Sequence, residues 1–125
     1  MLGNTDLSAI EDGSVTGIIK SMYTGTGKNG YYIFPNGLKL YCGYLTVTTS
    51  TASGSGAFCQ YYGSAHFDYP SGVSFNTVMS AIATISGNGA YQNATVRNVT
   101  TTGFDLWAGS NGNGSYTVYF EILGR

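Results

Sequence analysis

A proline–asparagine–glycine turn between two apolar segments constrains this chain more than any other feature. The segment Gly30–Gly43 reads GYYIFPNGLKLYCG, so a short aromatic strand, Tyr31–Phe34, runs into the turn Pro35–Gly37 and a second apolar strand follows. Proline fixes φ at the first turn position, and Asn-Gly accepts the positive φ that a tight hairpin requires. The sequence therefore predicts an antiparallel β-hairpin.

The chain continues this β pattern after the hairpin. Segments rich in β-branched and aromatic residues alternate with segments of Gly, Ser, Asn and Asp. The strands that we expect are Tyr31–Phe34, Leu38–Thr48, Phe58–Phe67, Val73–Ile85, Tyr91–Val99, Phe104–Ala108 and Tyr116–Leu123. Because Val73–Ile85 is almost entirely apolar or small, it is expected to be buried on both faces. Strands at this spacing predict an all-β fold, an antiparallel β-sandwich of about six to seven strands.

Alternation within the last two strands assigns side chains to opposite faces of a sheet. In Phe104–Ala108, Asp105 and Trp107 are expected to point away from the core. In Tyr116–Leu123, Tyr119 is expected to do the same. These outward residues face solvent or a partner.

Composition and charge limit the classes of function. The chain has 125 residues, of which 14% are aromatic and 9% are charged, and its formal net charge is -1. Neither disorder nor binding to nucleic acid is expected from such a composition. No apolar run approaches the roughly 18 residues of a membrane span, so membrane insertion is not expected. Residues 1–25 lack a basic start followed by an apolar run, so we expect no signal peptide.

Two regions are expected from the distribution of residues. Residues 1–29 hold sparse aliphatic side chains among Asp, Ser and Gly and are expected to form a linker or stalk segment. Residues 30–125 are expected to form the β-sandwich domain. Cys42 and Cys59 lie on neighbouring predicted strands, where they either form a disulfide or remain two separate buried thiols.

The chain offers little for catalysis or metal binding. It has six acidic residues, and no spacing pairs two of them in an obvious cleft. It has no Gly-x-Ser-x-Gly nucleophile elbow and no Cys-x-x-Cys pair, and His66 is its only histidine. We therefore expect no enzyme activity, no metal and no cofactor.

Three blocks of the sequence, in the same order, resemble the C-terminal domains of phage and prophage tail fibres. They are the Pro-Asn-Gly hairpin, Phe67–Phe75 (FDYPSGVSF), and the closing pair Val96–Leu106 (VRNVTTTGFDL) and Tyr116–Arg125 (YTVYFEILGR). The closing pattern is also similar to that of H-type lectins, which are small trimeric sandwiches that bind sugars. Two positions depart from these patterns. Phe120-Glu121-Ile122 stands where both groups usually have Trp-Ile-Ala, and Cys42 stands where the fibres often have Trp.

The resemblance implies a receptor-binding tip domain at the distal end of a homotrimeric fibre. Such a domain is attached to an upstream fibre shaft and binds a glycan or another receptor on the host surface. It belongs to the virion, is assembled in the bacterial cytoplasm and acts outside the cell. Two alternatives remain open, a trimerisation or capping domain without recognition and a secreted bacterial lectin or adhesin. A polysaccharide hydrolase is a third and weaker alternative.

Recognition of sugars requires aromatic side chains that stack on apolar ring faces and polar side chains that bind hydroxyl groups. The candidate binding residues are Trp107, Asp105, Arg97, Tyr61, Tyr62, Tyr91, Tyr119 and Asn111. Trp107, the only tryptophan, either stacks on a ligand or packs in a trimer interface. Arg97 and Asp105 flank a tight turn and are placed to form a cross-strand ion pair. The glycine-rich loop that contains Asn111 either carries recognition or only connects two strands.

Overall fold

The computed structural model describes residues 23–26, 29–52, 54, 59–87 and 91–125. This part of the chain contains nine strands and no helix, and therefore no helix that could cross a membrane. The strands are β1 (Tyr23–Thr26), β2 (Asn29–Ile33), β3 (Lys39–Thr49), β4 (Thr51–Ala52), β5 (Tyr61–Asp68), β6 (Val78–Ile85), β7 (Asn93–Arg97), β8 (Gly103–Ser110) and β9 (Gly114–Gly124).

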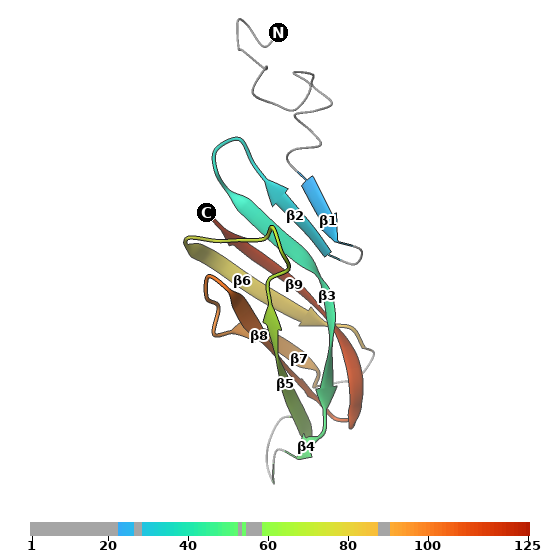
Figure 1. The fold of residues 1–125 in the computed structure, drawn as a ribbon. Helices are drawn as coiled ribbons and strands as arrows, with labels where there is room; N and C mark the ends of the chain where they lie inside the picture. The colour runs from blue at the N-terminus through green and yellow to red at the C-terminus, as the bar shows by residue number, and fades with distance from the viewer. Residues whose placement is uncertain (1–22, 27–28, 53, 55–58, 88–90) are drawn as a thin grey trace, which may run out of the picture.

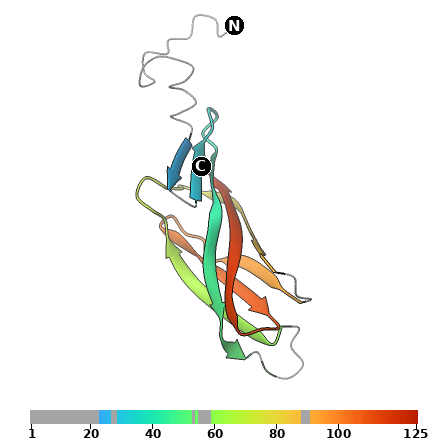
Figure 2. The same cartoon turned by 90° about the vertical axis from the view of Figure 1, so that its right-hand side faces the viewer.

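The strands form two antiparallel sheets that pack as a sandwich (Figure 1). Sheet A has five strands in the order β1-β2-β3-β9-β6, and sheet B has four in the order β4-β5-β8-β7. The long strands β3 and β9 pair along their whole length of 11 residues each and lie side by side in Figure 2. The predicted all-β antiparallel sandwich is confirmed.

Aromatic rings fill much of the core between the two sheets. Phe104 of β8 is fully buried, and its ring centroid lies 5.0 Å from that of Phe120 and 5.7 Å from that of Tyr69. Tyr41 and Phe67 also contact Phe104. Aromatic pairs at such distances contribute about 0.5–1.5 kcal/mol beyond the burial of their area. Burial raises the pKa of Tyr69 to about 12, so its phenol is neutral at physiological pH.

The alternation predicted for the last two strands is confirmed. In β8, Leu106 and Ala108 are fully buried, whereas Trp107 between them lies on the outer face of sheet B. In β9, Phe120 is buried, whereas Tyr119 is 49% exposed on the outer face of sheet A. On each of these two strands, alternate side chains therefore lie in the core and on the outer face of the sheet.

The prediction for Val73–Ile85 is wrong in extent and in burial. Strand β6 begins only at Val78 and is an edge strand of sheet A. Met79 and Ile82 on this strand are 57% and 55% exposed. The strand is therefore covered on one face, not on two.

A tight turn explains why the strand begins so late. The N–H of Val73 donates to the carbonyl of Pro70, and Gly72 between them has a φ of +89°. Only glycine adopts this conformation readily. After this turn, Val73 and Phe75 lie in a loop and are buried in the core. The apolar segment Val73–Ile85 therefore consists of a loop with two buried residues followed by an edge strand.

The predicted hairpin is present and joins β2 to β3. Gly37 has a φ of +82°, and its N–H donates to the carbonyl of Phe34 at 2.9 Å. Of the proposed stalk, residues 1–29, positions 1–22 and 27–28 lie outside the described residues. Strand β1 pairs with β2 and extends sheet A into this segment, and the boundary at residue 30 stays a prediction.

Cys42 and Cys59 are not joined in a disulfide. Cys42 lies on β3 in sheet A and is half-buried, whereas Cys59 is buried just before β5 in sheet B. Of the two alternatives, the structure therefore has separate thiols. The strand predicted over Phe58–Phe67 corresponds to β5, and its predicted first residue, Phe58, lies outside the described residues.

Candidate functional site

Four of the eight predicted binding residues lie together on the outer face of sheet B. Register and alternation place on this face Tyr62 of β5, Asp105 and Trp107 of β8, and Arg97 of β7. The Trp107 ring stacks on that of Tyr62, with centroids 6.4 Å apart and an interplanar angle of 20°. The Arg97 Cζ lies 4.9 Å from the centroid of Trp107. We call Tyr62, Trp107 and Arg97 the aromatic–arginine cluster.

A glycine makes room for the tryptophan ring. Gly109 is the next outward position of β8 after Trp107 and is paired with Tyr62 and Asn93 on the two neighbouring strands. A Cβ atom at Gly109 would lie only 2.8 Å from Trp107 Cη2. The ring therefore lies over backbone that carries no side chain.

The expected ion pair between Arg97 and Asp105 is not formed, although the two residues are register partners. The Asp105 carboxylate instead accepts a hydrogen bond from Asn98 Nδ2 at 2.6 Å, and its Oδ1 lies 2.6 Å from His66 Nδ1. The guanidinium of Arg97 lies over Trp107. Such a cation–π contact contributes about 0.5–1 kcal/mol at an exposed site. Arg97 has no carboxylate partner within the part of the chain that the structure describes.

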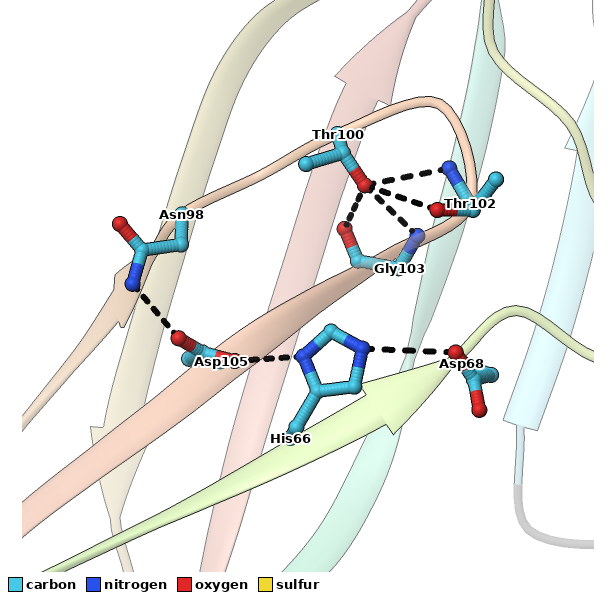
Figure 3. Close-up of polar contacts among 7 residues, drawn as sticks. All are labelled: His66, Asp68, Asn98, Thr100, Thr102, Gly103 and Asp105. Carbon is cyan, nitrogen blue, oxygen red and sulfur yellow. Dashed lines mark hydrogen bonds and ion pairs between the residues drawn. The ribbon is translucent and has the colours of Figure 1, made fainter.

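His66 belongs to this face and was missed from the sequence. Figure 3 shows its imidazole between the carboxylates of Asp105 and Asp68. His66 Nδ1 is directed to Asp105, and Nε2 lies 3.3 Å from Asp68 Oδ1. The hydrogen bond to Asp105 raises the pKa of His66, and the bonds from Asn98 and His66 lower the pKa of Asp105. The spacing of His66 from Tyr62 in one strand could have placed both on the same face, because alternate residues share a face.

A turn capped by Thr100 connects β7 to β8 beside His66 and Asp105 (Figure 3). Thr100 Oγ1 accepts hydrogen bonds from the N–H groups of Thr102, at 3.2 Å, and Gly103, at 3.1 Å. Asn98 begins the turn in a left-handed conformation, with a φ of 48°, and its side chain reaches Asp105. The turn thus holds β7 and β8 in the register that positions Arg97 and Asp105.

The other four predicted residues lie outside the aromatic–arginine cluster. Tyr61 is half-buried and points to the opposite face of β5 from Tyr62. Tyr91 is 57% exposed and precedes β7, and Asn111 lies in the turn between β8 and β9. Tyr119 is on the outer face of the other sheet.

The outer face of sheet A is a second and more apolar surface. Tyr119 contacts Tyr44 of β3, with ring centroids 5.9 Å apart, and Ile82 of β6 is 55% exposed beside them. A shallow cavity of about 320 Å³ lies here and is also lined by Cys42 and Glu121. Burial and then the Glu121 carboxylate raise the pKa of the Cys42 thiol, which keeps it protonated at neutral pH. We call Tyr44, Ile82, Tyr119 and Glu121 the sheet A face.

The two outer faces differ in what they can bind. The face of sheet B offers stacked rings, a cation, carboxylates and an amide, which together can hold a polar ring-shaped ligand. The sheet A face offers mainly apolar area around one carboxylate. Among the described residues, no group of three or more His, Cys, Asp or Glu side chains is placed to hold a metal ion.

Comparisons with known proteins bear on the fold. No family model matches the chain, and no curated protein matches it significantly. Among solved structures, the N-truncated R1-type pyocin tail fibre superposes with a TM-score of 0.59 at 12% identity, covering 90% of this chain and 97% of that chain. The fold is similar to that of pyocin tail fibres.

Longer pyocin fibres give the same result. The P. aeruginosa R1 pyocin fibre comprising C-terminal residues 323–701 has a TM-score of 0.59 at 12% identity, over 90% of this chain but 32% of that chain. An N-truncated R2-type pyocin tail fibre has a TM-score of 0.58 at 17% identity, over 90% of this chain and 43% of that chain. The chain thus spans about a third of the R1 fibre fragment. These matches support the predicted resemblance to tail-fibre domains, and the similarity to H-type lectins stays a prediction.

Proposed function

We propose that this chain is a receptor-binding domain of a phage or phage-like tail fibre, and that it binds a host-surface glycan through the outer face of sheet B. The fold similarity to pyocin tail fibres supports the fibre role. The aromatic–arginine cluster is the observation that carries the site. Stacked rings beside polar groups are the combination that recognises sugars. In this proposal the domain binds without catalysis and without a cofactor.

The same proposal gives the sheet A face a role in assembly. Ile82 and Tyr119 are 55% and 49% exposed and lie beside Tyr44, a grouping that a monomer rarely leaves open to water. Three copies around one axis would bury this face and leave sheet B turned outward. Glu121 then needs a hydrogen-bond donor within the interface. Residues 1–29 would join the homotrimer to an upstream shaft, in a virion tail that is assembled in the bacterial cytoplasm and acts outside the cell.

Adsorption to bacterial cells tests the proposed function. Labelled protein is mixed with a panel of strains, and the strain that retains it is used to compare variants. Trp107→Ala is expected to lose adsorption while keeping the native mass and a cooperative thermal unfolding transition. Phe34→Ala removes another partly exposed aromatic ring, in the hairpin that joins β2 to β3, and is expected to adsorb normally. Normal adsorption by Trp107→Ala would exclude the outer face of sheet B as the receptor site.

A trimerisation or capping role without recognition is the second candidate, and the apolar sheet A face favours it. This role predicts a native mass near three chains in light scattering and a smaller mass for Tyr119→Glu, which adds a charge to the interface. It also predicts that the isolated domain adsorbs to no strain. A stable monomer that binds glycans would instead favour a secreted lectin or adhesin.

A further inference from the structure

We propose that the aromatic–arginine cluster selects acidic sugars, namely saccharides that carry a carboxylate or phosphate group beside an apolar ring face. This inference rests on the proposed glycan-binding function and specifies the class of ligand. It follows from the available charge of Arg97, from the pairing of the carboxylates around it, and from the position of both next to Trp107.

Arg97 presents an available cation. Its side chain is exposed, and its guanidinium is held over Trp107 at 4.9 Å. Within the described residues it forms neither an ion pair nor a side-chain hydrogen bond, so its N–H donors are open to a ligand. A planar guanidinium binds carboxylate and phosphate through two parallel hydrogen bonds. Because stacking on Trp107 restricts the side chain beforehand, less conformational entropy is lost on binding.

The carboxylates near Arg97 already have partners. Asp105 is the register partner of Arg97, but its side chain is only 21% exposed and is held by Asn98 and His66 at 2.6 Å each. Asp68 lies 3.3 Å from the other ring nitrogen of His66. The two carboxylates of this face are therefore paired with His66 and Asn98, and not with Arg97. Arg97 is thereby left to bind an external anion.

The stack beside Arg97 supplies the second half of the site. Tyr62 and Trp107 form an aromatic surface that spans β5 and β8, and Arg97 adjoins it from β7. A sugar ring that packs on the exposed part of this aromatic surface, which includes Tyr62, would have the guanidinium of Arg97 at its side, where a charged substituent can bind. A neutral sugar would gain the stacking contact alone, which makes the charge the basis of discrimination.

Chemical neutralisation of the receptor tests this selectivity. Surface polysaccharide is purified from a strain to which the protein adsorbs and is compared in three forms: untreated, carboxyl-reduced, and dephosphorylated with hydrofluoric acid. Calorimetry is expected to show about tenfold weaker binding after one or both treatments, the loss that corresponds to a hydrogen bond with a charged group. The effective treatment identifies the anion as carboxylate or phosphate.

Variants of two arginines assign the effect to this site. Arg97→Gln is expected to weaken binding to the untreated polysaccharide by the same factor and to leave binding to the neutralised form unchanged. Arg125→Gln removes the same charge at the exposed end of the chain, after β9 of sheet A, and is expected to change neither. Thermal unfolding of both variants is measured in parallel to exclude a loss of folding.

Three results would overturn the inference. The first is equal wild-type binding to all three forms of the polysaccharide, and the second is an equal loss by Arg97→Gln on all three. The third is an equal loss of binding in Arg125→Gln. In each case the glycan-binding proposal survives. If the wild-type protein binds no polysaccharide from any strain, both the inference and the proposed function are wrong.

Discussion

A methyl group at Gly109 tests whether the position of Trp107 depends on bare backbone. In Gly109→Ala, the added Cβ would lie 2.8 Å from Trp107 Cη2, 2.8 Å from Asn93 Oδ1 and 2.9 Å from Cys59 Sγ, all closer than any normal contact. Cys59 is buried, and its thiol donates to the carbonyl of Tyr91. The Trp107 ring and the Asn93 side chain lie on the outer face and are freer to move, so we expect them to give way.

Two opposing free-energy terms set the size of the effect. Overpacking costs about 1–3 kcal/mol. Replacing glycine in a strand contributes about 0.5–1 kcal/mol in the other direction, because the unfolded chain loses conformational freedom. Gly109 is not among the glycines with positive φ, so the methyl adds no backbone strain. The net destabilisation is about 1 kcal/mol, which lowers Tm by about 4 °C in a domain of this size.

Fluorescence gives a specific readout, because Trp107 is the only tryptophan in the chain. Gly109→Ala is expected to shift its emission to longer wavelength, since the ring moves away from Tyr62 and Arg97 into water, and to weaken glycan binding. In the matched control Gly114→Ala, the nearest atom lies 3.8 Å from the new Cβ, so emission and binding should not change. Unchanged emission and unchanged affinity in Gly109→Ala would refute the argument.

Three further predictions concern stability. Phe104→Ala removes a fully buried ring and is expected to lower the free energy of unfolding by about 3–5 kcal/mol in urea titrations, and a loss below about 1 kcal/mol would contradict its central place in the core. Thr100→Val leaves the N–H of Gly103 without its side-chain acceptor and should cost about 1–2 kcal/mol in the same assay, whereas a neutral effect would mean that the turn does not depend on the hydroxyl. Because Asp105 raises the pKa of His66 above its ordinary 6.5, protonated His66 stabilises the fold fully below that value, and the contribution is lost as pH rises through the raised pKa. The stability advantage of the wild type over His66→Gln should therefore shrink as pH rises above about 6.5 and through the raised pKa of His66, and an advantage independent of pH would contradict this assignment.

Local patterns in the sequence were sufficient for most of the fold. The turn Pro35–Gly37 fixes its hairpin through backbone preferences of three adjacent residues, and alternation placed Trp107 and Tyr119 on outer faces. The prediction of a strand starting at Val73 was wrong because Val73 and Phe75 lie in the loop that follows the turn at Gly72 and are buried from there. An apolar run alone does not distinguish a buried strand from a loop that inserts side chains into the core.

The site was predictable only in part, because it depends on register between strands. Alternation shows that Trp107 faces outward, but not that Tyr62 and Arg97 lie on the strands at either side of it. The same limit explains the ion pair expected between Arg97 and Asp105. They are register partners, but His66 on a third strand, β5, forms a hydrogen bond with the Asp105 carboxylate.

Mapping a bound glycan onto the protein by NMR tests the central claim most directly. Amide chemical shifts are recorded while surface polysaccharide fragments from an adsorbing strain are added. We expect the largest changes on β5, β7 and β8 around Tyr62, Trp107 and Arg97. Changes confined to the sheet A face around Tyr119, or to the turn at Asn111, would contradict the claim that sheet B carries the receptor site.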